Sequence, residues 1–303
     1  MKFLKYAIHL TLSGLLLSAG ITAGAQAGDT GDLVSCEINC QDGILSVEAE
    51  VLAPDRDIVT GTLSSEVFDS AELLKQLYGE EEKWEYEDGN LCVLDYQKSE
   101  LPEEVFVSAG VFENTLSFDI KYFDVETQEM EKVLQETRTE SPEEISHMLG
   151  ISAVVTNLHE TDSGYRYYQL QELIEGVPTA WLSPVFSKYT MSYKGEYLVD
   201  VFYQGNFTVE DTSPVDILSA REALEMIQTY ADAGMVHCPP SGADITRIQL
   251  CYYLEEIEGT ITFRPVWVFS AGGSIWEGED YYMYEEMLYI DAQDGLLLKY
   301  IGM

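Results

Sequence analysis

The residues best suited by type to do chemistry in this sequence are His237 and Cys238, a base next to a nucleophile. A cysteine thiol becomes a reactive thiolate when a base lies within hydrogen-bond reach. Adjacent side chains seldom point at each other, however, and the prolines at positions 239 and 240 predict a rigid loop. We therefore interpret the pair as structural, and we predict that the chain has no catalytic residue and is not an enzyme.

Carboxylates are the second group of candidate catalytic residues, because the chain holds 54 aspartates and glutamates. Glycoside hydrolysis needs two carboxylates that face each other across a cleft. Glu175 and Glu258 occupy equivalent Glu-Gly turns and form the candidate pair, although the solvent exposure of a turn explains two glutamates there more simply. A secreted acid-base hydrolase with unidentified carboxylates therefore stays an alternative function.

The sequence predicts neither a metal site nor a cofactor. Cys36 and Cys40 lack the C-x-x-C spacing of a zinc site, and no histidine pair accompanies them. The glycine-rich phosphate-binding patterns and the D-x-[DN]-x-[DN]-G calcium loop are absent from the sequence as well. We interpret residues 291–295 as a hairpin turn in which Asp294 and Gly295 adopt positive φ.

Trp181 and Trp267 are the candidate residues for recognition, because they occupy comparable predicted strands in two similar segments. The simpler interpretation is that each packs a sheet against a helix, as large buried aromatic residues do. The alternative is a face that binds a peptide or a protein, since tryptophan is also enriched at interfaces. The two residues are therefore a speculative partner-binding face.

The two similar segments share one order of elements, which predicts a duplicated unit of one helix and three or four strands. Each opens with the Ser and Glu of a capping box, at Ser141 and at Ser219, followed by a helix. A long strand then reaches a Glu-Gly turn and an apolar strand returns. The predicted strands are 165–174, 181–186 and 197–203 in the first segment, and 245–257, 263–269, 288–292 and 296–298 in the second.

The first half of the chain carries its own pattern. Residues 45–51 alternate between apolar and polar types, which is the period of a half-buried strand. The other elements predicted there are a short capped helix over 71–78, strands over 105–107 and 116–122, and a charged helix over 126–140. The last of these would link the two halves.

These elements predict an α+β fold in which antiparallel sheets are each packed by short helices. We predict an N-terminal domain over 28–136 and a C-terminal domain over 137–303, the latter built from units 137–210 and 211–303. The length of 303 residues agrees with about two domains at ~150 residues each.

Charge and the N-terminus limit the partners and the place of action. The 16 basic and 54 acidic residues give a net charge of −38, which argues against a nucleic-acid partner because phosphates are bound through lysine and arginine. Two lysines precede an apolar stretch over 6–23, and Ala25-Gln26-Ala27 has the form of a signal-peptidase site. We predict a signal peptide over 1–27 and a secreted or envelope-associated protein. An uncleaved N-terminus that associates with the membrane, or lipidation at Cys36, is the alternative.

A resemblance to known families rests on two stretches near the C-terminus, Arg264-Pro265-Val266-Trp267-Val268-Phe269 and Tyr289-Ile290-Asp291-Ala292-Gln293-Asp294-Gly295. With the capped helices before them, they resemble the PepSY-like units of bacterial exported proteins and the extracytoplasmic domains of the YycH and YycI regulators. From Ser141 onward the chain is also similar to an uncharacterised family of exported, lipoprotein-related proteins of Gram-positive bacteria. The resemblance implies a non-enzymatic modulator of a membrane sensor kinase or a peptidase.

We therefore expect a non-catalytic extracytoplasmic binding or modulator protein that acts on a cell-surface sensor or peptidase. Its partner is an unknown protein at the cell surface, and the large negative charge favours basic surfaces or cations at long range. Besides the secreted hydrolase, an acidic envelope protein that binds cations is the alternative function.

Overall fold

The computed structural model describes residues 31–65, 84–87, 91–94, 105–112, 115–122, 139–185, 188–205, 207–237, 244–274 and 282–300. The predicted signal peptide, the helix predicted over 71–78 and residues 126–138 of the helix predicted over 126–140 lie outside these residues, and the described residues 139 and 140 are not helical. The described part is mostly β-strand, arranged in two sheets with two short helices. This is an arrangement of the α+β type.

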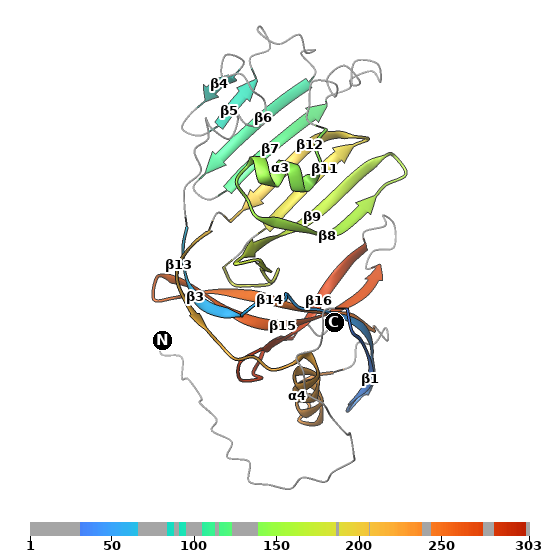
Figure 1. Cartoon of the computed structure of the whole chain (residues 1–303). Helices are drawn as coiled ribbons and strands as arrows, with labels where there is room; N and C mark the ends of the chain where they lie inside the picture. Colours follow the sequence, from blue (N-terminus) through green and yellow to red (C-terminus); the bar gives the residue numbers. More distant parts are fainter. Residues whose placement is uncertain are drawn as a thin grey trace, which may run out of the picture.

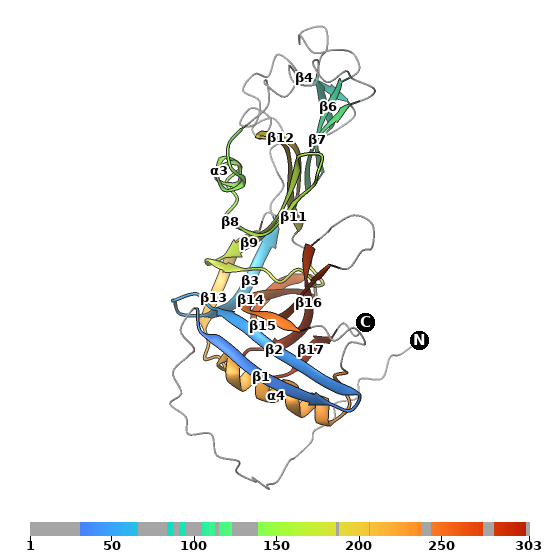
Figure 2. The ribbon, with the colours of Figure 1, turned by 90° about the vertical axis from the view of Figure 1, so that its right-hand side faces the viewer.

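The first sheet joins strands from both ends of the chain (Figures 1 and 2). Its described strand pairs are antiparallel, except that β2 and β14 are parallel. The strand order is β1 (Leu33–Cys40), β2 (Gly43–Leu52), β14 (Ile245–Ile257), β15 (Thr260–Ser274), β16 (Tyr282–Asp291) and β17 (Leu297–Tyr300), with β3 (Val59–Ser65) paired to both β15 and β13 (Phe207–Pro214).

The second sheet collects the middle of the chain and lies above the first in Figure 1. Its described strand pairs are all antiparallel. The order is β10 (Val177–Pro178), β9 (Tyr165–Ile174), β11 (Lys188–Lys194), β12 (Tyr197–Gln204), β7 (Thr115–Tyr122), β6 (Val105–Phe112), β5 (Leu91–Leu94) and β4 (Trp84–Glu87), with β8 (Ala153–Glu160) on the free side of β9.

The strands group differently from the contiguous domains that the sequence predicts. β1 to β3 belong to the predicted N-terminal domain, yet β2 and β3 pair with strands that follow residue 206, and β1 joins the same sheet through β2. β4 to β7 extend the sheet formed by β8 to β12. The reason is that backbone hydrogen bonds at a sheet edge accept any strand of suitable pattern, whatever its distance along the chain.

Helix α4 (Ala220–Asp232) covers one face of the first sheet. Its buried residues are spaced at intervals of three or four, so they form one apolar stripe: Ala220, Ala223, Leu224, Ile227 and Ala231. The stripe belongs to one core cluster with the alternating apolar residues of β2, of which Leu45, Val47, Ala49 and Val51 are buried. The prediction of a half-buried strand over 45–51 is confirmed.

The other face of the first sheet is covered by the segment that leaves the second sheet after β10. In this segment Ala180 donates its backbone N–H to the carbonyl of Tyr252 at 2.8 Å, and Leu182 donates to the Tyr289 hydroxyl at 2.9 Å. Ala180 packs there with a second cluster of buried residues, among them Cys251 and Val268. Because β14 and β15 are buried on both faces, their sequences read as nearly continuous apolar runs.

The start of α4 provides a first testable prediction. Ser219 Oγ accepts from the backbone N–H of Glu222 at 3.2 Å, and the Glu222 carboxylate accepts from the Ser219 N–H at 2.7 Å. Replacing Ser219 by alanine should lower the free energy of unfolding at pH 7 by about 1 kcal/mol. Urea unfolding followed by circular dichroism measures this.

The cost of that substitution should also depend on pH. The hydrogen bond from the Ser219 backbone, followed by the bond from its hydroxyl, lowers the pKa of Glu222 below its ordinary 4.5. A carboxylate with a lowered folded-state pKa stabilises the fold fully above its unfolded pKa, and the effect is lost as the pH falls through the folded value. The cost of Ser219→Ala should therefore shrink between pH 7 and pH 3. In a Glu222→Gln background it should not.

Gly61 of β3 is a site of close backbone approach. An irregularity in β13 between Val209 and Asp211 brings the Asp211 carbonyl oxygen to 1.9 Å from where a Cβ on Gly61 would lie. Gly61→Ala must therefore push two backbones apart, and we expect it to cost about 2 kcal/mol in thermal or urea unfolding. Ser65→Ala, at the exposed end of the same strand, should stay within ~0.5 kcal/mol of the parent. Equal losses of stability for Gly61→Ala and Ser65→Ala would contradict the close approach of β3 and β13 at Gly61.

Candidate functional site

One face of the second sheet presents a set of polar and aromatic residues from three adjacent strands. Tyr167 of β9 lies between His159 of β8 and Ser192 of β11 in the register of the sheet. Two residues further along β9, Gln169 lies between its own pair of neighbours. Because side chains alternate along a strand, all of these point to the same side. The set is Asn157 and His159 of β8, Tyr167, Gln169 and Gln171 of β9, and Thr190 and Ser192 of β11.

The opposite face of the same strands is a closed core under helix α3 (Pro142–Met148), which Figure 2 shows beside the sheet. Ser146 donates to the Tyr189 hydroxyl at 2.9 Å, and Tyr193 donates to the Glu140 carbonyl at 2.8 Å. Burial raises the pKa of both tyrosines. These contacts join α3 to the sheet, and the other face of the three strands carries the polar and aromatic set.

The face that carries the polar and aromatic set is hollowed to a volume of about 300 Å³. Trp181, in the segment that connects the two sheets, forms part of the wall. The hollow is lined by Asn157, His159, Tyr167, Tyr168, Gln169, Trp181, Lys188, Thr190, Met191 and Ser192. Small-molecule and peptide sites commonly have this mixture of aromatic walls and a few polar groups, and they favour junctions between structural units.

A second, much smaller hollow of about 20 Å³ adjoins the first where the two sheets meet. Asn157, Gln169 and Trp181 line both, so we treat the two as one feature and call it the cleft. The residues that line only the small hollow are Thr156, Gln171, Arg247, Gln249 and Ser270. Three of these come from β14 and β15 of the first sheet, which therefore close this end of the cleft.

Stacked rings form the other end of the cleft. The rings of His159 and Tyr167 lie 6.2 Å apart at an interplanar angle of 22°. Tyr165, which does not line the cleft, continues the stack outside it at 6.2 Å and 19°. All three side chains are half-buried. Such a stack presents flat apolar surface to a ligand together with polar edges.

The cleft is positively charged although the whole chain carries −38. Lys188 lines the large hollow and Arg247 the small one, and neither lining includes an aspartate or glutamate. The Lys188 ammonium lies 5.3 Å from the centre of the Phe202 ring. Within the described part of the chain Lys188 forms no ion pair. Its charge is therefore available to a ligand.

The two tryptophans of the speculative partner face have different environments. Trp181 lines the cleft and is half-buried. Trp267 is 3% exposed, packs in the core with α4, and donates its indole N–H to the Leu218 carbonyl at 2.8 Å. They do not share a surface. The prediction that both lie in comparable strands was also wrong, because residues 181–185 leave the sheet to dock on β14 instead of continuing β10.

Most residues of the cleft were not predicted. The sequence pattern identified 165–174 as a strand, and β9 confirms it, but it did not indicate which face is open. The available signal was the alternation in β11, where Lys188, Thr190 and Ser192 are polar while the intervening residues are buried. Assembling the cleft required the register of three strands.

The other candidate residues have structural explanations or lie outside the description. Glu175 and Glu258 have φ of 48° and 54°, each followed by a glycine with positive φ, as two-residue hairpin turns require. His237 Nδ1 lies 3.4 Å from Asp42 at the surface. Cys238 is outside the described residues. Cys36 is exposed in β1, so cleavage before it for lipidation would remove the start of that strand.

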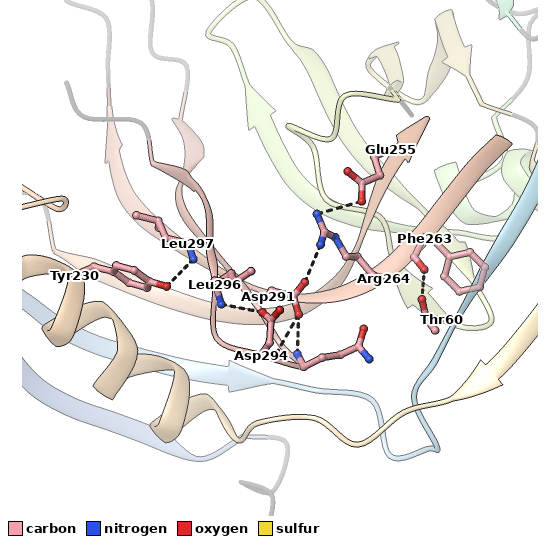
Figure 3. A network of polar contacts seen from close by, with 10 residues as sticks. Thr60, Tyr230, Glu255, Phe263, Arg264, Asp291, Asp294, Leu296 and Leu297 are labelled. Carbon is pink, nitrogen blue, oxygen red and sulfur yellow. Dashed lines mark hydrogen bonds and ion pairs between the residues drawn. The ribbon is translucent and has the colours of Figure 1, made fainter. Parts of the chain in front are cut away.

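The predicted turn at 291–295 is confirmed as the link between β16 and β17, with one correction (Figure 3). Gly295 adopts a φ of 74°, but Asp294 does not have positive φ. The Asp291 carboxylate instead organises the turn, because it accepts from the backbone N–H of Gln293 at 2.8 Å and also receives Arg264 at 3.1 Å. Arg264 holds Glu255 at 3.1 Å as well, so this network ties strands together.

The described residues form neither a metal-binding cluster nor a membrane-spanning helix. Among the residues that the structure describes, no group of three or more His, Cys, Asp or Glu side chains is arranged to hold a metal ion. No helix within the described ranges has the length and apolar character needed to cross a membrane.

Comparison with known proteins finds a solved structure with a similar fold. No family model matches the chain, and no curated protein matches its sequence. Among solved structures, the chain is similar to the crystal structure of an uncharacterised protein from Eubacterium rectale, with a TM-score of 0.55 and 14% sequence identity. The similarity covers 88% of this chain and 93% of the other. At this identity the similarity shows a shared fold over most of both chains.

Proposed function

We propose that the protein is a non-catalytic extracytoplasmic binding protein whose binding site is the cleft beside Trp181. The observation that carries the proposal is the cleft's lining of half-buried rings, amides and hydroxyls at the junction of two sheets. These groups stack and form hydrogen bonds, which is the chemistry of recognition. The closed core under α3 and the segment 177–185 hold them in place.

The proposal extends to where the protein acts and on what. The apolar N-terminal stretch and its Ala-x-Ala site support export. The resemblance to PepSY-like and YycI-like units supports a role as modulator of a cell-surface sensor or peptidase. The two capping boxes and the two Glu-Gly hairpin turns support a duplicated unit, although β8 precedes β9 in the first copy with no counterpart described before β14.

Site-specific photo-crosslinking in cells tests the proposal. A photoreactive phenylalanine analogue replaces Tyr167, which lines the cleft. The matched control places it at Leu158, which is 47% exposed on β8 and points to the opposite side of the sheet from His159. We expect one discrete crosslinked product in the envelope or medium fraction from position 167 and none from 158.

Two results would contradict the proposal. Equal crosslinking from both positions would show that the cleft has no special role. No product from position 167 in either fraction would remove the cleft as the binding site. Determining the N-terminal residue of the purified protein in the same cells tests the predicted export, since cleavage after Ala27 should give a chain that starts at Gly28.

A further inference from the structure

The shape of the cleft limits what can occupy it. Its large hollow holds about 300 Å³ and opens to solvent, whereas the adjoining small hollow holds about 20 Å³. The small hollow has room for roughly one water molecule, so no chain can pass through it. Arg247 and Ser270 of the first sheet close this end. A polypeptide that lies along a groove closed at one end must terminate at that end, because the chain cannot continue past it.

The length of the cleft fits only a few residues. Along β9 it runs from Tyr167 at the aromatic end to Gln171 at the closed end. Four residues of strand span about 13 Å at ~3.3 Å each. An extended ligand of three or four residues therefore fills it.

Charge decides which end of a polypeptide fits. Both cations lie toward the closed end, since Arg247 lines the small hollow with Gln171, and Lys188 precedes Tyr189, the partner of Leu170. An amino terminus carries positive charge and would need carboxylates, which the lining does not contain. A terminal carboxylate instead gains charge-assisted hydrogen bonds from lysine and arginine.

The acidity of the chain as a whole does not oppose this assignment. Screening confines the interaction between exposed charges to ~8 Å at physiological ionic strength, so the two cations of the cleft dominate at contact. The distant carboxylates attract a partner whose surface is basic elsewhere.

From these observations we propose that the cleft captures the C-terminal carboxylate of a partner polypeptide. The carboxylate would contact Lys188 in the large hollow and reach Arg247 through the one water that fits in the small hollow, with the last side chains against Trp181 and Tyr167. The side-chain amides of Asn157 and Gln169 lie between these ends and pair with the peptide backbone. This inference rests on the proposed function, because it names the part of the partner that the cleft receives.

A matched pair of peptide pools tests it. The immobilised full chain is offered tetrapeptides Ac-Ala-Ala-X-X, randomised at the last two positions, with either a free carboxyl terminus or a C-terminal amide. Mass spectrometry identifies what is retained, and calorimetry measures the affinity of the most enriched sequence in both forms. The free acid should bind about tenfold or more tightly than the amide. Aromatic or large apolar residues should be enriched at the last position.

Variants at one strand provide the controls. Lys188→Gln should weaken binding of the free acid about tenfold and leave the amide unchanged, whereas Lys188→Arg should keep the parent affinity. Lys194→Gln removes the same charge from the same strand, but Lys194 lies over Tyr165, 4.1 Å from its ring centre, and does not line the cleft. It should leave both affinities unchanged. Circular dichroism confirms that each variant is folded.

Retention of the acid and amide pools to the same extent would overturn the carboxylate assignment, and so would retention of neither pool. The crosslinking experiment at position 167 tests the cleft as a binding site independently of the peptide pools. If position 167 gives a crosslinked partner but the acid and amide pools are retained equally, the cleft remains the binding site. Only the proposal that it receives a C-terminal carboxylate is then wrong.

Discussion

Replacing Trp267 by alanine should lower the free energy of unfolding by about 3–5 kcal/mol, the usual cost of removing a large buried aromatic side chain. The indole belongs to β15, is 3% exposed, and packs in the core cluster that includes the buried residues of α4. Its N–H donates to the Leu218 carbonyl at 2.8 Å, just before the helix begins, so the substitution also leaves that carbonyl without its donor. Urea unfolding followed by circular dichroism measures the loss.

Trp181→Ala provides the matched comparison, because the same side chain is removed at a half-buried position in the cleft. We expect it to cost less than about 1.5 kcal/mol in stability, since less apolar surface is uncovered. It should also abolish the crosslink from position 167. Trp267→Phe should fall between the two, because it keeps most of the packing and loses the hydrogen bond. Equal stability losses for Trp181→Ala and Trp267→Ala would contradict the different environments described for the two residues.

Elements that depend on local signals were predicted well. The capping box at Ser219 identified the start of α4, and the Glu-Gly pair at 258–259 identified the hairpin between β14 and β15. In both cases neighbouring residues satisfy each other's backbone groups or supply the unusual φ. The information therefore lies within a few positions of the sequence.

Sheet membership was not predicted, because it depends on pairs of strands far apart in the chain. β2 alternates in burial as its sequence indicates, yet nothing in that alternation names β14 as its parallel neighbour. The same holds for β3, which lies between β13 and β15. Assigning residues 28–136 to one domain followed from continuity along the chain, and continuity carries no information about which edge a strand pairs with.

The candidate site failed to emerge from sequence for a related reason. Trp181 was singled out by residue type, but its role follows from the departure of residues 181–185 from the sheet to dock on β14. The positive character of the cleft is hidden in a composition of 54 acidic residues. It becomes visible only when register brings Lys188 close to Gln171, and packing of the two sheets adds Arg247.

Replacing Asp291 by alanine should lower the free energy of unfolding by about 3 kcal/mol, because it removes both the oxygen that accepts from the Gln293 N–H in the turn and the buried partner of Arg264. The Asp291 side chain is 3% exposed and lies 3.1 Å from Arg264, which is 29% exposed. The exposure of Arg264 and its second ion pair with Glu255 keep the cost at the lower end of the range for buried pairs.

The backbone bonds of Asp291 separate two contributions to that cost. Asp291→Asn removes the charge but keeps an oxygen that can accept from the Gln293 N–H, so it should cost about 1 kcal/mol. Glu255→Gln removes only the half-exposed partner of Arg264 and should cost less than about 1 kcal/mol. Hydrogen exchange at the amide of Gln293 should accelerate in Asp291→Ala and change little in Asp291→Asn. If Asp291→Asn were as damaging as alanine, the ion pair with Arg264 and not the turn would stabilise the β16–β17 hairpin, because charge is the property that both substitutions remove.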